Sequence, residues 1–138
     1  MEEIWKPIFD FPRYFISNLG RVRSTYSYKI LKLKKCRDGY LKVCLCKNKS
    51  KHYVFVHRLV ANAFIANPNR YPIINHKDEN KANNCYTNLE WCTHKYNNNY
   101  GNSIIKRINA AKTKRHNKML QEVSDCSINI KVNLQSSI

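Results

Sequence analysis

One histidine of the chain stands where a short apolar run meets a polar loop. Residues 73–76 read Ile-Ile-Asn-His, and a mostly polar stretch follows as far as residue 88. The pKa of a histidine lies near neutral pH, so its imidazole can take a proton from water and later release it. His76 is therefore a candidate general base, although a histidine at the end of a strand can also be purely structural.

The sequence around this histidine predicts two short strands, a loop between them and a helix. The apolar residues of 73–76 and 89–92 are typical of short strands, and Thr93 is a suitable N-cap for a helix that begins at the next residue. Asn97 then lies one turn into that helix. We expect this order to bring Asn97 close to the Asn75-His76 pair, around one cleft.

Three further segments have a recognisable period. Alternation of polar and apolar residues predicts an antiparallel meander with a basic face over residues 20–57, and the spacing changes to that of a helix over 57–65. A second helix with a basic outer face is expected over 103–119, and Gly101 is expected to weaken or break the helix before it. Residues 126–138 show no clear period.

The charge of the chain points to a polyanionic partner. Its 138 residues include 25 Lys and Arg against 9 Asp and Glu, a formal net charge of +16. A folded domain with this charge repels itself, and binding to nucleic acid would relieve that cost. A solubilising surface is the alternative explanation. The candidate phosphate-binding residues are Arg21, Arg23, Lys32, Lys34, Lys42, Lys106, Arg107, Lys112, Lys114 and Arg115.

The cysteines and the apolar runs exclude several classes of protein. The six cysteines include no Cys-x-x-Cys pair, which argues against a zinc site and favours small, half-buried strand residues. No apolar run approaches the length of a membrane span. The acidic and aromatic start of the chain, residues 1–5, does not resemble a signal peptide. We expect a soluble intracellular protein of one domain, or one domain with an appendage.

At residues 73–100 the chain resembles the HNH nuclease motif of the ββα-metal (His-Me finger) fold. His76, Asn88 and Asn97 match the three positions of the motif. The preceding VHRLVANAFIANP is similar to the helix that leads into the motif in homing-type endonucleases of phages and giant viruses. EIWKPI and YFISNLGRVRS resemble the nuclease-associated modular DNA-binding domain that commonly precedes it. The two modules occur in their usual order, which strengthens the resemblance.

This resemblance implies an α+β fold in three parts. Residues 1–50 would form a small antiparallel β module that binds DNA, and residues 51–118 an HNH nuclease domain that ends in a basic helix. Residues 119–138 would be a C-terminal tail.

The resemblance also implies a reaction and the residues that perform it. The chain would cleave or nick DNA, leaving 5′-phosphate and 3′-hydroxyl ends. His76 and Asn88 are the expected catalytic residues, with His76 as the base that activates water and Asn88 pinning the loop. Asn75 and Asn97 would hold one divalent ion, Mg²⁺ or Mn²⁺, through their carbonyl oxygens.

Three positions depart from the family pattern. Many relatives have Asp or His at the position of Asn75, the third motif residue is Asn97 rather than His, and Glu79 stands where relatives often have Gly. Two amides bring no negative charge to a metal, so a DNA-binding protein that has lost catalysis is the alternative hypothesis. A zinc-stabilised nucleic-acid binder is a weaker one.

Overall fold

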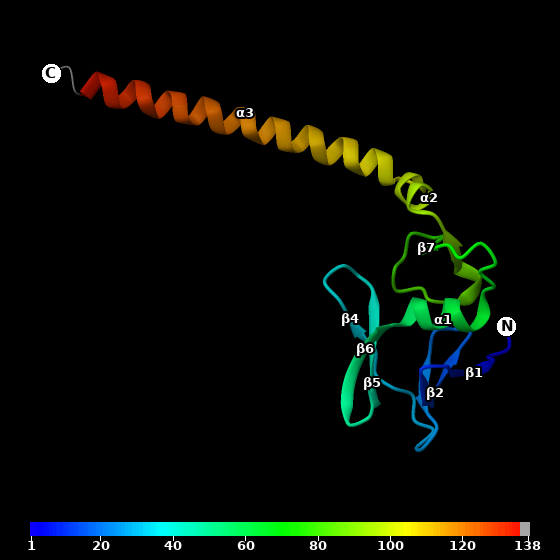
Figure 1. Ribbon diagram of the computed structural model, residues 1–138. Helices are drawn as coiled ribbons and strands as arrows, with labels where there is room; N and C mark the ends of the chain where they lie inside the picture. The colour runs from blue at the N-terminus through cyan, green and yellow to red at the C-terminus, as the bar shows by residue number, and fades with distance from the viewer. Residues whose placement is uncertain (136–138) are drawn as a thin grey trace. The chain divides into compact units, whose positions relative to one another are not determined.

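The computed structural model describes residues 1–135. They divide into two compact units, one of residues 1–97 and one that begins at residue 98. The first unit combines small antiparallel sheets with helices, which confirms the predicted α+β class (Figure 1).

The first sheet is built from the aromatic start of the chain. Its strands are β1 (Trp5–Ile8), β2 (Phe11–Ser17) and β3 (Val22–Ser24), paired antiparallel in that order. Ile16 and Val22 lie opposite one another in the register and are fully buried. A tight turn joins β2 to β3, in which the Gly20 N–H donates to the Ser17 carbonyl at 3.0 Å.

The second sheet follows the alternation of its sequence. Its strands are β4 (Lys34–Lys35), β5 (Leu41–Lys47) and β6 (Ser50–Phe55), again antiparallel and in chain order. Val43 and Leu45 are buried, whereas Cys44 and Cys46 on the other face of β5 are more exposed. The β4–β5 hairpin turns at Gly39, with φ +89°.

The single meander expected over residues 20–57 is wrong in two respects. β3 belongs to the first sheet, because Phe11–Ser17, which the sequence did not mark as a strand, pairs with it. Residues 29–36, where lysines alternate with apolar residues, form only the two-residue strand Lys34–Lys35, with one isolated bridge between Arg23 and Ile30. Tyr28, at φ +52°, bends the chain just before this stretch, which limits its pairing.

Helix α1 (Val56–Phe64) joins the parts of the first unit. Its buried face includes Leu59 and Val60, at the spacing of an amphipathic helix. It packs against β1, β2, β5, β6, β7 and β8, and Figure 1 shows it where these strands meet. One hydrophobic cluster therefore runs from Ile8 through α1 to Leu89. A domain boundary near residue 50 stays a prediction.

The segment around the candidate base has the predicted order. It comprises β7 (Ile73–His76), the short 3₁₀ helix η1 (Tyr86–Asn88), β8 (Leu89–Cys92) and α2 (His94–Asn99). β7 and β8 pair antiparallel. The N-cap prediction is confirmed, because Thr93 Oγ1 accepts a hydrogen bond from the Tyr96 N–H at 3.1 Å.

The second unit consists mainly of α3 (Ser103–Gln135). Gly101, at φ +54°, separates it from α2, as the sequence predicted. The expectation that the helix ends near residue 119 is wrong, since it continues to Gln135. No Gly or Pro follows residue 101, so nothing in the sequence stops the helix. Residues 136–138, the end of the predicted C-terminal tail, lie outside the described residues.

Among the described residues, no helix has both the length and the apolar character to cross a membrane.

Candidate active site

His76 is buried at the end of β7. Its side chain is 5% exposed, and its Nε2 lies 3.1 Å from Oδ1 of Asn84, which is itself 3% exposed. Burial lowers the pKa of His76 below its usual value, and the nearby Lys81 charge adds to this, while Asn84 and Asp78 oppose it. The imidazole is therefore neutral at neutral pH, the form in which it can accept a proton.

Aromatic rings surround this imidazole. The His76 ring lies 5.4 Å from the ring of His57 and 5.9 Å from that of Tyr40. His57 is buried in α1, and its Nδ1 has no hydrogen-bond partner. Burial, with smaller contributions from the charges of His76 and Arg58, lowers the pKa of His57 to about 4. Two neutral imidazoles thus pack together at the end of β7.

Asn75 and Asn97 approach one another at the Cys92 thiol. Burial raises the pKa of this thiol, and Glu90 raises it further, whereas hydrogen bonds with the backbones of Asn75 and Asn97 lower it. The backbones of the two predicted metal ligands therefore lie beside the same sulfur atom. Asn75 is buried and adjoins His76 in the sequence, so the structure brings all three predicted residues into one neighbourhood.

The Asn75 side chain is oriented by a partner on the facing strand. Asn75 and Glu90 are opposite in the β7–β8 register, and Asn75 Nδ2 donates to Glu90 Oε1 at 2.8 Å. This bond uses the amide nitrogen and leaves the Oδ1 lone pairs for another contact.

Asn88 ties the two ends of the loop together. Its Nδ2 donates to Asp78 Oδ1 at 2.8 Å and to the Asn83 carbonyl at 2.9 Å, and its Oδ1 accepts from the Asp78 N–H at 3.1 Å. Glu79 within this loop has φ +59°, the left-handed conformation that a glycine would adopt more easily. The hydrogen bonds of Asn88 therefore hold the two ends of the loop together although Glu79 stands where relatives often have glycine.

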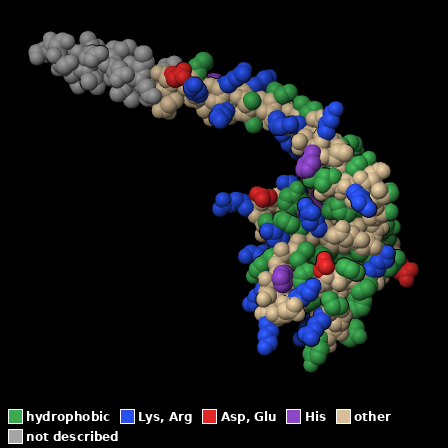
Figure 2. All heavy atoms as spheres, viewed as in Figure 1, with side chains coloured by type: hydrophobic (Ala, Val, Ile, Leu, Met, Phe, Trp, Pro, Cys, Tyr) green, Lys and Arg blue, Asp and Glu red, His purple; other side chains and the backbone are tan. Residues whose placement is uncertain are grey.

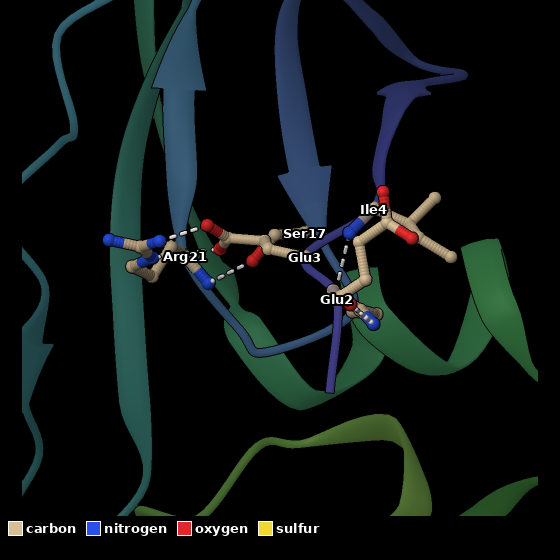
Figure 3. Close-up of polar contacts among 6 residues, drawn as sticks. Glu2, Glu3, Ile4, Ser17 and Arg21 are labelled. Carbon is tan, nitrogen blue, oxygen red and sulfur yellow. Dashed lines mark hydrogen bonds and ion pairs between the residues drawn. The ribbon is translucent and has the colours of Figure 1, made fainter.

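The predicted DNA-binding residues of the β module differ in their neighbours, which are an acidic residue, aromatic rings or solvent. Arg21 forms an ion pair with Glu3 (Figure 3). The Arg23 guanidinium lies 4.3 Å from the centroid of the Trp5 ring, and its Nε is buried without a partner. Lys34 and Lys42 face one another across β4 and β5, where Lys42 Nζ lies 4.4 Å from the Phe55 ring. Lys32 is exposed.

The predicted basic residues of α3 are all exposed, namely Lys106, Arg107, Lys112, Lys114 and Arg115. Arg107 also donates to the Asn98 carbonyl. Figure 2 shows basic side chains scattered over the visible face, with few acidic ones among them. DNA contact by any of these residues stays a prediction.

Comparison with known proteins identifies the family. Residues 3–46 match the NUMOD4 motif. Over 96 residues the chain is 48% identical to the "Uncharacterized HNH endonuclease L245" of Acanthamoeba polyphaga mimivirus, a match that covers 70% of this chain and 29% of that protein. It is 42% identical over 94 residues to "DNA endonuclease I-HmuI" of Bacillus phage SP01, covering 67% and 54%.

A solved structure agrees with these matches. The chain superposes on the one described as "DNA binding and cleavage by the HNH homing endonuclease I-HmuI", with a TM-score of 0.67 and 34% identity. The match covers 88% of this chain and 68% of that one. The chain belongs to the HNH endonuclease family. The resemblance seen in the sequence is thereby confirmed, although the chain spans only 29% and 54% of the two curated relatives.

This HNH protein places side chains at its site that the sequence did not single out. The register of β7 and β8 would have set Glu90 opposite Asn75, so the pairing of the two predicted strands was a usable signal. Asn84 lies inside an irregular loop, and no period predicts its contact with His76. Tyr40 comes from a hairpin far away in the sequence.

The donor atoms around Asn75 fit the divalent metal that the HNH family implies. Mg²⁺ and Mn²⁺ favour oxygen ligands, and the amide oxygen of Asn75 is not used by its bond to Glu90. Glu90 also brings a carboxylate to the same strand pair. Among the side chains that the structure describes, no group of three or more His, Cys, Asp or Glu is arranged to hold an ion.

Proposed function

We propose that this chain is a metal-dependent DNA endonuclease that cleaves or nicks phosphodiester bonds, with His76 as the general base. The observation that carries the proposal is the buried, neutral imidazole of His76, held at Nε2 by Asn84 and adjacent to Asn75. The identity to I-HmuI, a DNA endonuclease by name, supports the same substrate.

The proposed role of His76 follows from the chemistry of a phosphodiester. This group is anionic and its leaving oxygen is poor, so hydrolysis needs a water molecule that loses its proton as it attacks. With Nε2 occupied by Asn84, the remaining nitrogen, Nδ1, is the one that takes this proton.

Asn75 and Asn97 are proposed to hold the divalent ion through their side-chain oxygens. Such an ion, when bound, stabilises negative charge on the phosphate and on the departing 3′ oxygen. Glu90 keeps the Asn75 amide turned so that its nitrogen, not its oxygen, faces the strand partner.

The positive charge of the chain supports DNA as the partner. The nine acidic residues can neutralise only part of the 25 Lys and Arg, which leaves a net charge of +16. Exposed lysines and arginines on β4 and on α3 are proposed to contact backbone phosphates, which fixes the position of the duplex without reading its sequence.

The test is conversion of a supercoiled plasmid by the purified protein. We expect nicked or linear product with Mg²⁺ or Mn²⁺ and none with EDTA. The second candidate, a DNA-binding protein of the same fold without catalysis, is favoured by Asn75, which brings no charge to the metal. A mobility shift of the plasmid without cleavage, in either metal at any concentration, would establish that candidate instead.

A further inference from the structure

The contact between His76 and Asn84 joins two deeply buried polar groups. Both side chains are at most 5% exposed, and His76 Nε2 lies 3.1 Å from Asn84 Oδ1. A carbonyl oxygen can only accept a hydrogen bond, so His76 Nε2 must carry the proton. The lone pair is then on Nδ1, the atom assigned above to the attacking water.

We propose that Asn84 is the positioning residue of His76, and that the N-terminal turn at residues 17–20 holds Asn84 in place. The effect on cleavage rests on the proposed function of His76. The orientation and protonation of the ring do not, and they can be measured without any activity.

The unpaired Nδ2 of Asn84 indicates that the side chain acts through its other amide atom, Oδ1, which contacts His76. Asn84 Nδ2 is buried and has no hydrogen-bond partner. Leaving a buried donor unpaired costs free energy, so packing alone gives no reason for an amide here. A carboxylate at this position would keep the acceptor that faces His76 and remove the donor that bonds nothing, and its negative charge would favour a proton on Nε2.

Gly20 brings the N-terminal turn against Asn84. A Cβ added at Gly20 would lie 2.9 Å from Asn84 Cβ and 3.2 Å from its carbonyl oxygen. The φ of +84° at Gly20 also disfavours any other residue. Just beyond the contact, the Asn18 carbonyl accepts from the Tyr86 N–H at 2.9 Å. The turn is therefore fitted to the segment that carries Asn84.

Several hydrogen bonds make this turn a stable support. Arg21 N–H donates to Ser17 Oγ at 3.0 Å, and Ser17 N–H donates to the Arg21 carbonyl at 2.8 Å. Asn18 Oδ1 accepts from the Ile4 N–H at 2.9 Å, which binds the turn to the start of the chain. The region that matches the NUMOD4 motif would thus help to position the base, through contacts within the same compact unit.

The first test is the tautomer of His76, read from long-range ¹H–¹⁵N spectra of the histidine rings. The His76 signals are assigned by their loss in His76→Ala. We expect the Nε2–H form in the wild type and in Asn84→Asp, and a mixture of forms in Asn84→Ala. An Nδ1–H form in the wild type, or unchanged His76 signals in Asn84→Ala, would overturn the proposal.

The second test is nicking by the same variants. Asn84→Ala should lower kcat by about 10- to 100-fold, a part of what a general base contributes, and leave DNA affinity unchanged. Asn84→Asp should retain most of kcat. Equal losses in both variants would contradict a role for the acceptor. If the wild type does not nick DNA, the proposed function fails. The tautomer of His76 then still shows whether Asn84 orients the ring.

The turn is tested with two matched glycines. Gly20 and Gly39 have φ of +84° and +89°, so alanine strains the backbone similarly at both. At Gly39 the new Cβ would meet only the Lys81 side chain, at an ordinary 3.7 Å. Gly20→Ala should shift the His76 ring signals and lower kcat clearly more than Gly39→Ala, because only at Gly20 does the new Cβ collide with Asn84. The same response in both variants would refute the part assigned to the turn.

Discussion

His57 is the buried histidine whose charge state has the clearest consequence for stability. It contacts His76, Tyr40 and Phe55, and its pKa is lowered to about 4. In the unfolded chain its pKa is near 6.5. Between pH 6.5 and pH 4, His57 binds a proton in the unfolded chain but not in the folded protein. The free energy of unfolding therefore decreases as the pH falls.

We therefore predict acid lability in a defined window. The free energy of unfolding should be fully present above pH 6.5 and should decrease towards pH 4, by about 3 kcal/mol at most from His57. His57→Phe fills the same site without a titrating group or an unpaired Nδ1, and should flatten this dependence. Denaturant unfolding of both proteins at several pH values measures it. Parallel curves would remove His57 as the cause.

A second prediction at the residue scale concerns the metal ligands. Asn97→Ala should raise the Mg²⁺ concentration needed for nicking, because one of few oxygen ligands is lost. Asn75→Asp should lower that concentration by adding charge. Without metal, however, the new carboxylate would face Glu90 where a hydrogen bond was, and should destabilise the fold by about 1–3 kcal/mol.

The double variant Asn75→Asp/Glu90→Gln is the control for this prediction. The glutamine amide can donate to the new carboxylate, so stability in EDTA should recover, while the lower Mg²⁺ requirement persists. If none of these variants changes the Mg²⁺ dependence of nicking, Asn75 and Asn97 are not the ligands.

At the scale of elements, the sequence predicts best where a period and a cap coincide. The β7–β8–α2 segment matches expectation because its apolar runs are short and Thr93 marks the helix start. β1 and β2 escaped prediction because their aromatic residues are crowded rather than alternating. The contacts of His76 with Asn84 and Tyr40 join an irregular loop and a distant hairpin, which no local pattern encodes.

The loop itself supplies the next prediction. Asn88→Ala removes the three hydrogen bonds to Asp78 and Asn83 and should cost about 2 kcal/mol of unfolding free energy. Nicking should fall with it, because the loop carries Asn84. Asn80→Ala is the matched control, since Asn80 Oδ1 accepts only a local bond from the Ala82 N–H. Equal stability of the two variants would show that Asn88 does not close the loop.

On the scale of the whole molecule, the excess of positive charge predicts salt-sensitive DNA binding. Each phosphate contact should add about 0.9 to the slope of log affinity against log salt. Replacing Lys112, Lys114 and Arg115 with glutamine should flatten this slope and weaken two unrelated duplexes equally. The titration uses a His76→Ala background to prevent cleavage. An unchanged slope would mean that α3 presents a solvated face and that other residues bind the phosphates.

The role of His76 as general base is tested most directly by the nicking rate of His76→Ala at saturating Mg²⁺, measured beside its affinity for the same DNA. Loss of the base should lower the rate by about 10²-fold or more and leave the affinity near that of the wild type, because the imidazole moves a proton and does not hold the duplex. His52→Ala, at an exposed histidine of β6, should keep both values. A His76→Ala protein that nicks DNA at the wild-type rate would show that His76 is not the general base.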